Sequence, residues 1–331
     1  MKAKGIQLRW SLITLILFVV IALIGLIFSI DGSSIDSNNY LTPPFQDWGQ
    51  SILGTDALGR NVLSGIIRGA SIALQLGILT IGLVLLIAIP IGVLSGFYGN
   101  KYMLGFPELV LNFLSFFFLS YNLCYFGFNG LSLLLLLLAF YSMVFLPIHF
   151  DLIAKNRWKL KVPIDNILMK IAEVFKSIPS LILLIIILSF WSKTGIFSIA
   201  VSLSILLWVR IARFIRGEIL AIKETEFIQS QISLGSSDAH IIFKHCLPRA
   251  MKPVWIYLVF LFGAIILLEA TLSFIGLGLP IDQISWGSML NESRKYIEAW
   301  WIALFPGMVL FFLMFALNKE SEAWKNWRNS E

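Results

Sequence analysis

Long apolar runs separated by short polar segments dominate this chain. A helix of about 20 apolar residues crosses the ~30 Å hydrocarbon layer of a bilayer, and most of the runs approach that length. Eight runs are candidate spans: 11–30, 71–96, 109–125, 131–149, 174–192, 196–212, 254–275 and 300–317. The two runs within 109–149 are either two short spans in a hairpin or one re-entrant pair. The pattern predicts an all-α membrane protein, a polytopic helical bundle.

The composition agrees with a bilayer as the solvent. Hydrophobic residues make up 58% of the chain and charged residues 13%, whereas soluble domains carry about 25% charged residues. The formal charge of +6 requires no nucleic acid as partner, because membrane proteins collect Lys and Arg in cytoplasmic loops. Lys2, Lys4 and Arg9 precede the first run, which is longer than a usual signal core, so we expect a retained span.

The distribution of basic residues predicts the orientation. With the N-terminus inside and all eight runs crossing, 20 Lys and Arg fall inside and 5 outside, which together account for all 25. The positive-inside rule then places both termini in the cytoplasm. Treating 109–149 as a re-entrant pair leaves the other assignments unchanged. Two substantial outer loops follow, 31–70 and 276–299, which are connectors in the simplest interpretation; Trp286, Trp300 and Trp301 suit a membrane–water interface.

The polar, basic stretch 217–253 is the most informative region of the chain. Its first helix is expected over 218–234, and Gly235 ends it because glycine tolerates the left-handed conformation. Apolar residues recur on one side of that helix: Ile219, Ile222, Phe227, Ile228 and Ile232. Ser236, Ser237 and Asp238 offer N-cap oxygens for a second helix, which should stop before Pro248. The apolar side either packs on the chain's own bundle or fills a groove in another protein.

No catalytic or cofactor motif is present. The sequence holds no Gly-Lys dipeptide and hence no Walker A loop, and no GxSxG, HExxH or CxxC motif. Cys246 lies beside His245, with His240 nearby, but a second ligand pair at metal spacing is missing, so no metal is predicted. Glu269 stands out inside an apolar run and is a functional candidate by default, although we favour a structural hydrogen bond.

Several segments resemble one transporter family. Residues 226–248 are similar to the EAA loop of bacterial ABC importer permeases. Further segments resemble, in the expected order, the second-permease branch of the dipeptide, oligopeptide and nickel importers. They are 53–63 (LGTDALGRNVL), 178–180 (IPS), 269–278 (EATLSFIGLG), 285–290 (SWGSML) and 303–307 (ALFPG). The resemblance covers about 50–100 and 168–318.

The resemblance implies a type I, MetI-like core of six spans in the bacterial cytoplasmic membrane. It implies a non-enzymatic half-channel for peptides, paired with a homologous permease, two cytosolic ABC ATPases and an extracytoplasmic binding protein. Nickel or another small solute is the alternative cargo. The residues that would couple to the ATPase are Glu226, Gln229, Ser230, Gln231, Gly235, Leu247 and Pro248. Glu269 would lie on the pathway or at a gate. An ATP-independent carrier predicts several intramembrane charges, and a membrane enzyme predicts convergent catalytic groups; neither pattern is evident.

Three departures from the family pattern are clear. Residues 229–231 read Gln-Ser-Gln where the family has Glu-Ala-Ala. The insertion 101–165 adds the extra hairpin and a basic tract, 155–161, which we interpret as a positive-inside anchor rather than a site for anionic membrane lipids. The tail 319–331 does not match the usual ending. The expected divisions are an N-terminal span with its extracytoplasmic segment (1–70), a permease domain 71–318 containing the coupling loop 217–250, and the cytosolic tail.

Overall fold

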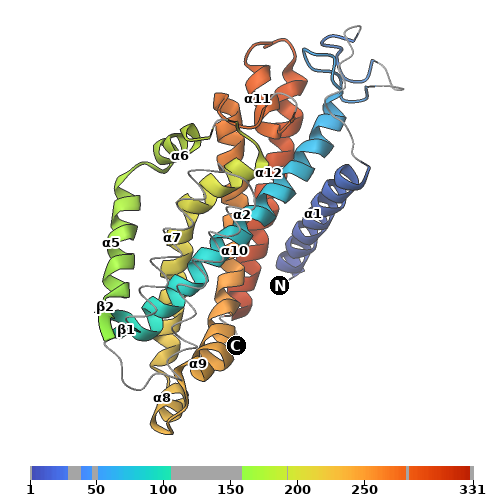
Figure 1. Cartoon of the computed structure of the whole chain (residues 1–331). Coiled ribbons are helices and arrows are strands. Elements are labelled where there is room, and N and C mark those ends of the chain that lie inside the picture. Colours follow the sequence, from blue (N-terminus) through green and yellow to red (C-terminus); the bar gives the residue numbers. More distant parts are fainter. Residues whose placement is uncertain are drawn as a thin grey trace. The chain divides into compact units, whose positions relative to one another are not determined.

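The computed structural model describes residues 2–28, 39–46, 51–105, 159–191, 193–280 and 283–328. These residues are almost entirely helical (Figure 1), as the all-α prediction requires. The exception is an antiparallel ribbon of β1 (Tyr102–Gly105) and β2 (Lys159–Val162), in which Tyr102 lies opposite Val162. The predicted spans 109–125 and 131–149, and most of the basic tract 155–161, lie outside the described residues.

The helices account for most of the predicted apolar runs. Their bounds are α1 (Lys2–Ile27), α2 (Val62–Tyr98), α5 (Ile164–Ser177), α6 (Ser180–Ser189), α7 (Ile196–Lys223), α8 (Glu226–Ser233), α9 (Asp238–His240), α10 (Leu247–Ile275), α11 (Trp286–Ser293) and α12 (Trp300–Arg328). Among the described residues, four helical stretches are long and apolar enough to cross a membrane, and the bent pair α5–α6 is a possible fifth. α1 adds a shorter apolar stretch, Leu12–Ile27. The totals of eight spans and a six-span core stay predictions.

The candidate span 174–192 is bent in the structure, and whether it crosses the membrane stays a prediction. Two helices, α5 and α6, meet there at an angle of 95°. Ile178 is extended, with φ −101° and ψ 130°, and Pro179 follows it. The proline ring disfavours helical geometry in the preceding residue, and proline has no N–H to continue the helix. The apolar run is therefore broken at this dipeptide.

Both outer loops are more ordered than connectors. α2 begins at Val62 instead of residue 71, so it includes the end of the expected loop 31–70. The expected loop 276–299 contains α11, which begins with a capping box: the Ser285 hydroxyl accepts from the Ser288 N–H at 3.3 Å, and the Ser288 hydroxyl accepts from the Ser285 N–H at 2.9 Å. These reciprocal bonds satisfy two orphan donors of a short helix.

The described chain forms two compact units, which we call the first and second unit. The first comprises 1–81, 181–204 and 256–331; the second comprises 82–180 and 205–255. In the first unit the indole N–H of Trp286 donates to the Ile66 carbonyl at 3.0 Å, and that of Trp301 donates to the Thr55 carbonyl at 2.9 Å. Both rings are buried in the protein, and a position at the depth of the membrane–water interface stays a prediction for them. Trp300, by contrast, is exposed.

In the second unit, two glycines of α2 allow a close approach to α7. A Cβ atom at Gly92 would lie 2.7 Å from the Ala212 carbonyl oxygen, and one at Gly96 would lie 2.8 Å from the Cβ of Ile219. Small residues four apart let two helix backbones pack closely within a membrane. The facing residues Ala212, Ile215 and Ile219 of α7 are fully buried as a result. The expected domain boundaries at residues 70 and 318 stay predictions.

Candidate functional site

The segment after α7 is bent twice, and we call residues 224–246 the bent segment. α7 runs on to Lys223 and α8 begins at Glu226, so the single helix predicted over 218–234 is wrong. Thr225 is extended, with φ −68° and ψ 143°, and its hydroxyl donates to the Ile222 carbonyl at 2.7 Å. The side-chain amide of Gln229 donates to the Lys223 carbonyl at 2.9 Å. Side chains therefore satisfy the last carbonyls of α7 and end it there.

The second bend, at Gly235, agrees with the prediction. Gly235 has φ +78°, in the left-handed region that costs an L-residue energy. Its N–H donates to the Ile232 carbonyl at 3.0 Å, and the Ser236 N–H donates to the Gln231 carbonyl at 3.1 Å. This pair of bonds is the Schellman motif, which closes a helix at its C-terminus. As predicted, a cap follows: the Ser237 hydroxyl accepts from the His240 N–H at 3.3 Å and begins α9.

The second helix of the segment does not end before Pro248, contrary to the prediction. A π-helical turn, Ile241–Cys246, joins α9 to α10, and Asp238–Ile275 forms one continuous helical stretch. In this wider turn the Leu247 N–H reaches back to the Ile242 carbonyl. The changed hydrogen-bond register accommodates a residue that has no N–H, so the proline enters the helix without ending it. Leu247 and Pro248 mark the start of α10 and not a helix end.

The apolar side chains of the bent segment divide into two sets. The buried set, Ile228, Ile241, Ile242 and Cys246, packs within the chain. The outward set is partly exposed: Leu234 is 79% exposed, Phe227 42% and Ile232 41%. Phe227 also lies against the Arg249 guanidinium, 4.9 Å from its ring centroid. The buried set thus packs on the chain's own bundle, whereas the insertion of the outward set into a groove of another protein stays a prediction.

The polar residues of α8 hold the shape of the segment. Gln229 contacts the end of α7, and the Ser236 hydroxyl contacts the Gln231 side-chain oxygen at 3.0 Å, across the Gly235 bend. The Ser230 hydroxyl donates to the Glu226 carbonyl at 2.8 Å, one turn back. Glu226 lies exposed in the first turn of α8, where a negative charge complements the helix dipole. The Gln-Ser-Gln sequence therefore supplies internal hydrogen bonds, and a glutamate at residue 229 could not donate the first of them.

A polar brace in the second unit connects α7 to its neighbours. The Arg216 guanidinium of α7 pairs with the Asp165 carboxylate of α5, with Nη2 to Oδ2 at 2.8 Å, and the Ser95 hydroxyl of α2 donates to the same carboxylate at 2.9 Å. The Lys223 ammonium donates to the Phe97 carbonyl near the end of α2. The sequence singled out none of these residues. Asp165 and Arg216 each lie beside an apolar run, which was the available signal. They are 51 residues apart, so the sequence did not indicate that they pair.

Glu269 lies in α10 and is buried, where it accepts a hydrogen bond from the Ser273 hydroxyl at 2.7 Å. This contact confirms the expected structural hydrogen bond. A role for Glu269 on the pathway or at a gate stays a prediction. Among the described residues there is no group of three or more potential metal ligands, including around Cys246 and His245.

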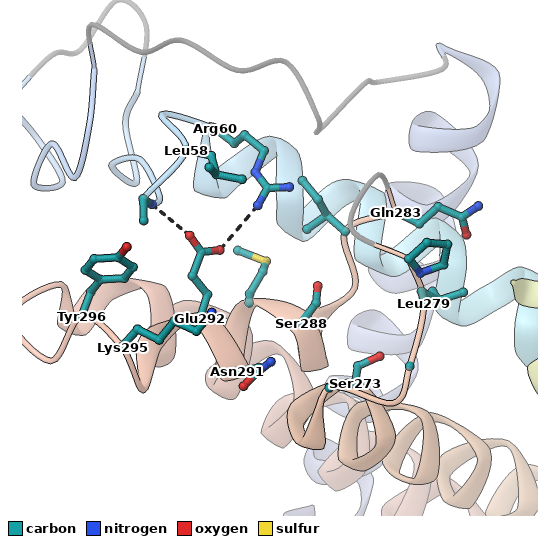
Figure 2. Close-up of a pocket in the computed structure, with 16 residues that line it drawn as sticks. Leu58, Arg60, Ser273, Leu279, Gln283, Ser288, Asn291, Glu292, Lys295 and Tyr296 are labelled. Carbon is teal, nitrogen blue, oxygen red and sulfur yellow. Dashed lines mark hydrogen bonds and ion pairs between the residues drawn. The ribbon is translucent and has the colours of Figure 1, made fainter. Parts of the chain in front are cut away.

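A cavity of about 400 Å³ with both polar and apolar lining residues lies in the first unit beside α11. Figure 2 shows Glu292 reaching across it to two partners. One carboxylate oxygen accepts from the Ala57 N–H at 3.0 Å, and the other lies 3.6 Å from an Arg60 guanidinium nitrogen. Arg60 also pairs with Asp56 at 2.7 Å. Burial, with the nearby Asp56 charge, raises the pKa of Glu292 above the ordinary glutamate value.

These contacts bring together two segments that the sequence placed in separate loops. Arg60 and Asp56 belong to the 53–63 motif, and Glu292 follows the 285–290 motif. Arg60 and Glu292 are far apart in the sequence, so the sequence alone did not indicate that they pair. The contact joins α11 to the segment before α2.

Long apolar helices interrupted by one bent polar segment define a multi-pass helical membrane protein. Within that class, residues 152–323 match the family model described as binding-protein-dependent transport system inner membrane component. The match covers more than half of the chain, so the protein belongs to this family of inner-membrane transport permease components.

Curated relatives agree with this assignment. The chain is 26% identical to the oligopeptide transport system permease protein OppC of Bacillus subtilis over 311 residues, which cover 93% of this chain and 80% of the relative. It is 37% identical to a putative peptide transport system permease protein of Brucella suis over 155 residues, 46% of this chain and 52% of the relative. OppC of Salmonella typhimurium is 33% identical over 156 residues, 47% of this chain and 51% of that protein. The chain thus spans about half the length of the Brucella relatives that it matches.

Proposed function

We propose that this chain is the permease subunit of an ABC importer and forms half of a path that carries peptides across the cytoplasmic membrane. Family membership supports the transport role, and the names of the relatives, which refer to peptide, oligopeptide and glutathione transport, support the cargo. No Walker A sequence is present, so separate chains must bind and hydrolyse the ATP that drives transport.

The bent segment is the coupling element in this proposal. The observation that carries it is the exposure of Leu234, Phe227 and Ile232 on a segment whose own backbone bends are already satisfied by hydrogen bonds. A pre-formed helix with outward apolar side chains suits a groove in a partner protein, and binding it costs little conformational entropy. A cleft in a cytosolic ABC ATPase is the groove we assign to it.

The close packing of α2 on α7 at Gly92 and Gly96, together with the polar brace, supports transmission of force from the bent segment to the membrane helices. α8 is hydrogen-bonded to α7 through Gln229, and α7 is held to α2 and α5 through Lys223 and Arg216. A displacement of α8 by an ATPase would therefore move these helices together, in a hinge or shear transition.

The complete assembly contains a homologous permease, two ATPases and an extracytoplasmic binding protein. The excess of basic residues in the segments assigned to the inside supports an orientation with both termini in the cytoplasm. Glu269 would border the path near its outer end. The binding protein would deliver its cargo at the outer loops, where α11 and residues 53–63 meet.

Uptake in cells tests the proposal. A strain lacking this gene should lose uptake of labelled di-, tri- or oligopeptides and regain it with the wild-type gene. Co-purification in detergent should recover an ATPase whose activity responds to peptide-loaded binding protein. Retained peptide uptake in the deletion strain, together with lost nickel uptake, would assign the cargo to the alternative class. A chain that purifies alone and still transports would reject an ABC permease.

A further inference from the structure

Three cations surround a recess of about 260 Å³ in the second unit, next to the break between α5 and α6. Lys176 of α5 and Arg210 and Arg213 of α7 line it. Within the described residues of the chain, no carboxylate forms an ion pair with any of the three. Arg216, one turn further along α7, is bound by Asp165. The recess thus concentrates positive charge that the described residues do not neutralise.

The remaining walls of the recess are mainly apolar. They comprise Ala172, Phe175, Ile178, Pro179, Leu206 and Val209, together with Ser180. Phe175 also contacts Trp208 of α7 edge-on, at 6.4 Å between ring centroids. A ligand that fits must therefore carry an anionic group joined to an apolar group. Inorganic anions satisfy only the first of these conditions.

In the proposed orientation the recess lies toward the cytoplasmic end of the membrane-spanning part of α7. Arg210 lies 14 residues after the start of α7 at Ile196, or about 21 Å along the helix, and Arg213 about 26 Å, within a hydrocarbon layer of ~30 Å. Long basic side chains at such a position extend toward the aqueous interface. Val174 of α5, beside the recess in sequence, is 59% exposed, as expected of a residue that meets acyl chains.

We propose that the recess bounded by Lys176, Arg210 and Arg213 binds the phosphate of an anionic phospholipid, whose acyl chains follow the apolar wall. Basic pockets between transmembrane helices on the inner side bind anionic headgroups by this combination of charge and apolar contact. The lipid would fill the angle between α5 and α7 that the Ile178–Pro179 break leaves open. This site is separate from the bent segment and involves none of its residues.

Binding of labelled phosphatidylglycerol to the purified full-length chain in detergent tests the proposal, with phosphatidylcholine of identical acyl chains as the uncharged comparison. Each cation near an anionic lipid is worth about fivefold in affinity. Arg210→Gln with Arg213→Gln should therefore weaken phosphatidylglycerol binding roughly 25-fold and leave phosphatidylcholine binding unchanged. The double lysine variant at the same positions keeps both charges and should bind within about twofold of wild type, which separates lost charge from lost folding.

Lys170→Gln is the matched control, because Lys170 lies on the same helix as Lys176, α5, but does not line the recess. It should leave binding unchanged. Equal binding by wild type and the double glutamine variant would overturn the proposal, as would an equal loss in Lys170→Gln, which would indicate general attraction to the surface. Displacement of the lipid by peptides with a free C-terminal carboxylate, but not by their amides, would assign the recess to transported cargo and also overturn it.

Discussion

The bend at Gly235 allows a graded test of the coupling proposal. Its φ of +78° lies in the left-handed region, and a Cβ atom built there meets no atom within 4 Å. An alanine would therefore suffer no collision. Its cost is that of holding an L-residue in this conformation, about 1–2 kcal/mol. Asparagine tolerates the conformation better and should cost less.

Proline is the severe member of the series. Its ring holds φ near −65°, far from the observed angle, and it removes the N–H that donates to the Ile232 carbonyl. The Schellman motif cannot form, so the bend should be lost. We expect Gly235→Pro to abolish peptide uptake while membrane insertion stays normal, because the substitution lies outside the long apolar helices.

The assay is peptide uptake and ATP hydrolysis by the assembled complex in proteoliposomes. A shift of about 1–2 kcal/mol in the bend corresponds to a roughly 5- to 30-fold lower population of the competent shape. Uptake per ATP should fall in the order Gly, Asn, Ala and Pro. Gly99→Ala is the matched control, because Gly99 also has positive φ (59°) and open space around its Cβ, but lies at the end of α2. Normal uptake by Gly235→Pro would refute the reasoning.

Three further changes test other contacts. Gln229→Glu replaces an amide donor to the Lys223 carbonyl with an acceptor and should lower coupled uptake more than Gln229→Ala does, with a loss of about 1 kcal/mol in local stability measurable by hydrogen exchange. Asp165→Asn leaves Arg216 without its charged partner and should lower the melting temperature. Combining it with Arg216→Gln removes the unpaired charge and should recover some of the loss. The pKa of Glu292 is raised in the folded chain. At a pH between the ordinary glutamate pKa and this raised pKa, the folded state keeps a proton on Glu292 that the unfolded state has released. The free energy of unfolding should therefore fall as the pH rises through this range. Glu292→Gln should remove this dependence in thermal melts across the mildly acidic range, and an unchanged pH profile would contradict the assignment.

Within the part of the chain that the structure describes, the apolar runs were a reliable guide to which segments are helical, because burial in lipid or protein requires continuous apolar surface. The helix ends were less predictable. Pro179 ends a helix and the residue before it, Ile178, is extended. Pro248 does not end one, because a π-turn supplies a different hydrogen-bond register. Both prolines look alike in sequence. The difference depends on the tertiary surroundings.

In the candidate site, too, some features could be predicted from the sequence and others could not. The Gly235 bend and the Ser237 cap were predictable, since both depend on residues within one or two turns. The break at Thr225 was not predicted, because apolar residues recur at helical spacing on both sides of it and Thr225 and Gln229 are also ordinary polar residues for the exposed face of one continuous helix. Contacts between distant segments, such as Glu292 with Arg60, leave no periodic trace in the sequence.

Photo-crosslinking in living cells tests the central claim most directly. A photoreactive residue at Leu234, the most exposed apolar position of the bent segment, should form an adduct with a separate cytosolic ATPase. The same residue at Trp255, 61% exposed on α10, serves as a control that should not reach the ATPase. Adducts from Leu234 only with lipid or with this same chain would contradict the account.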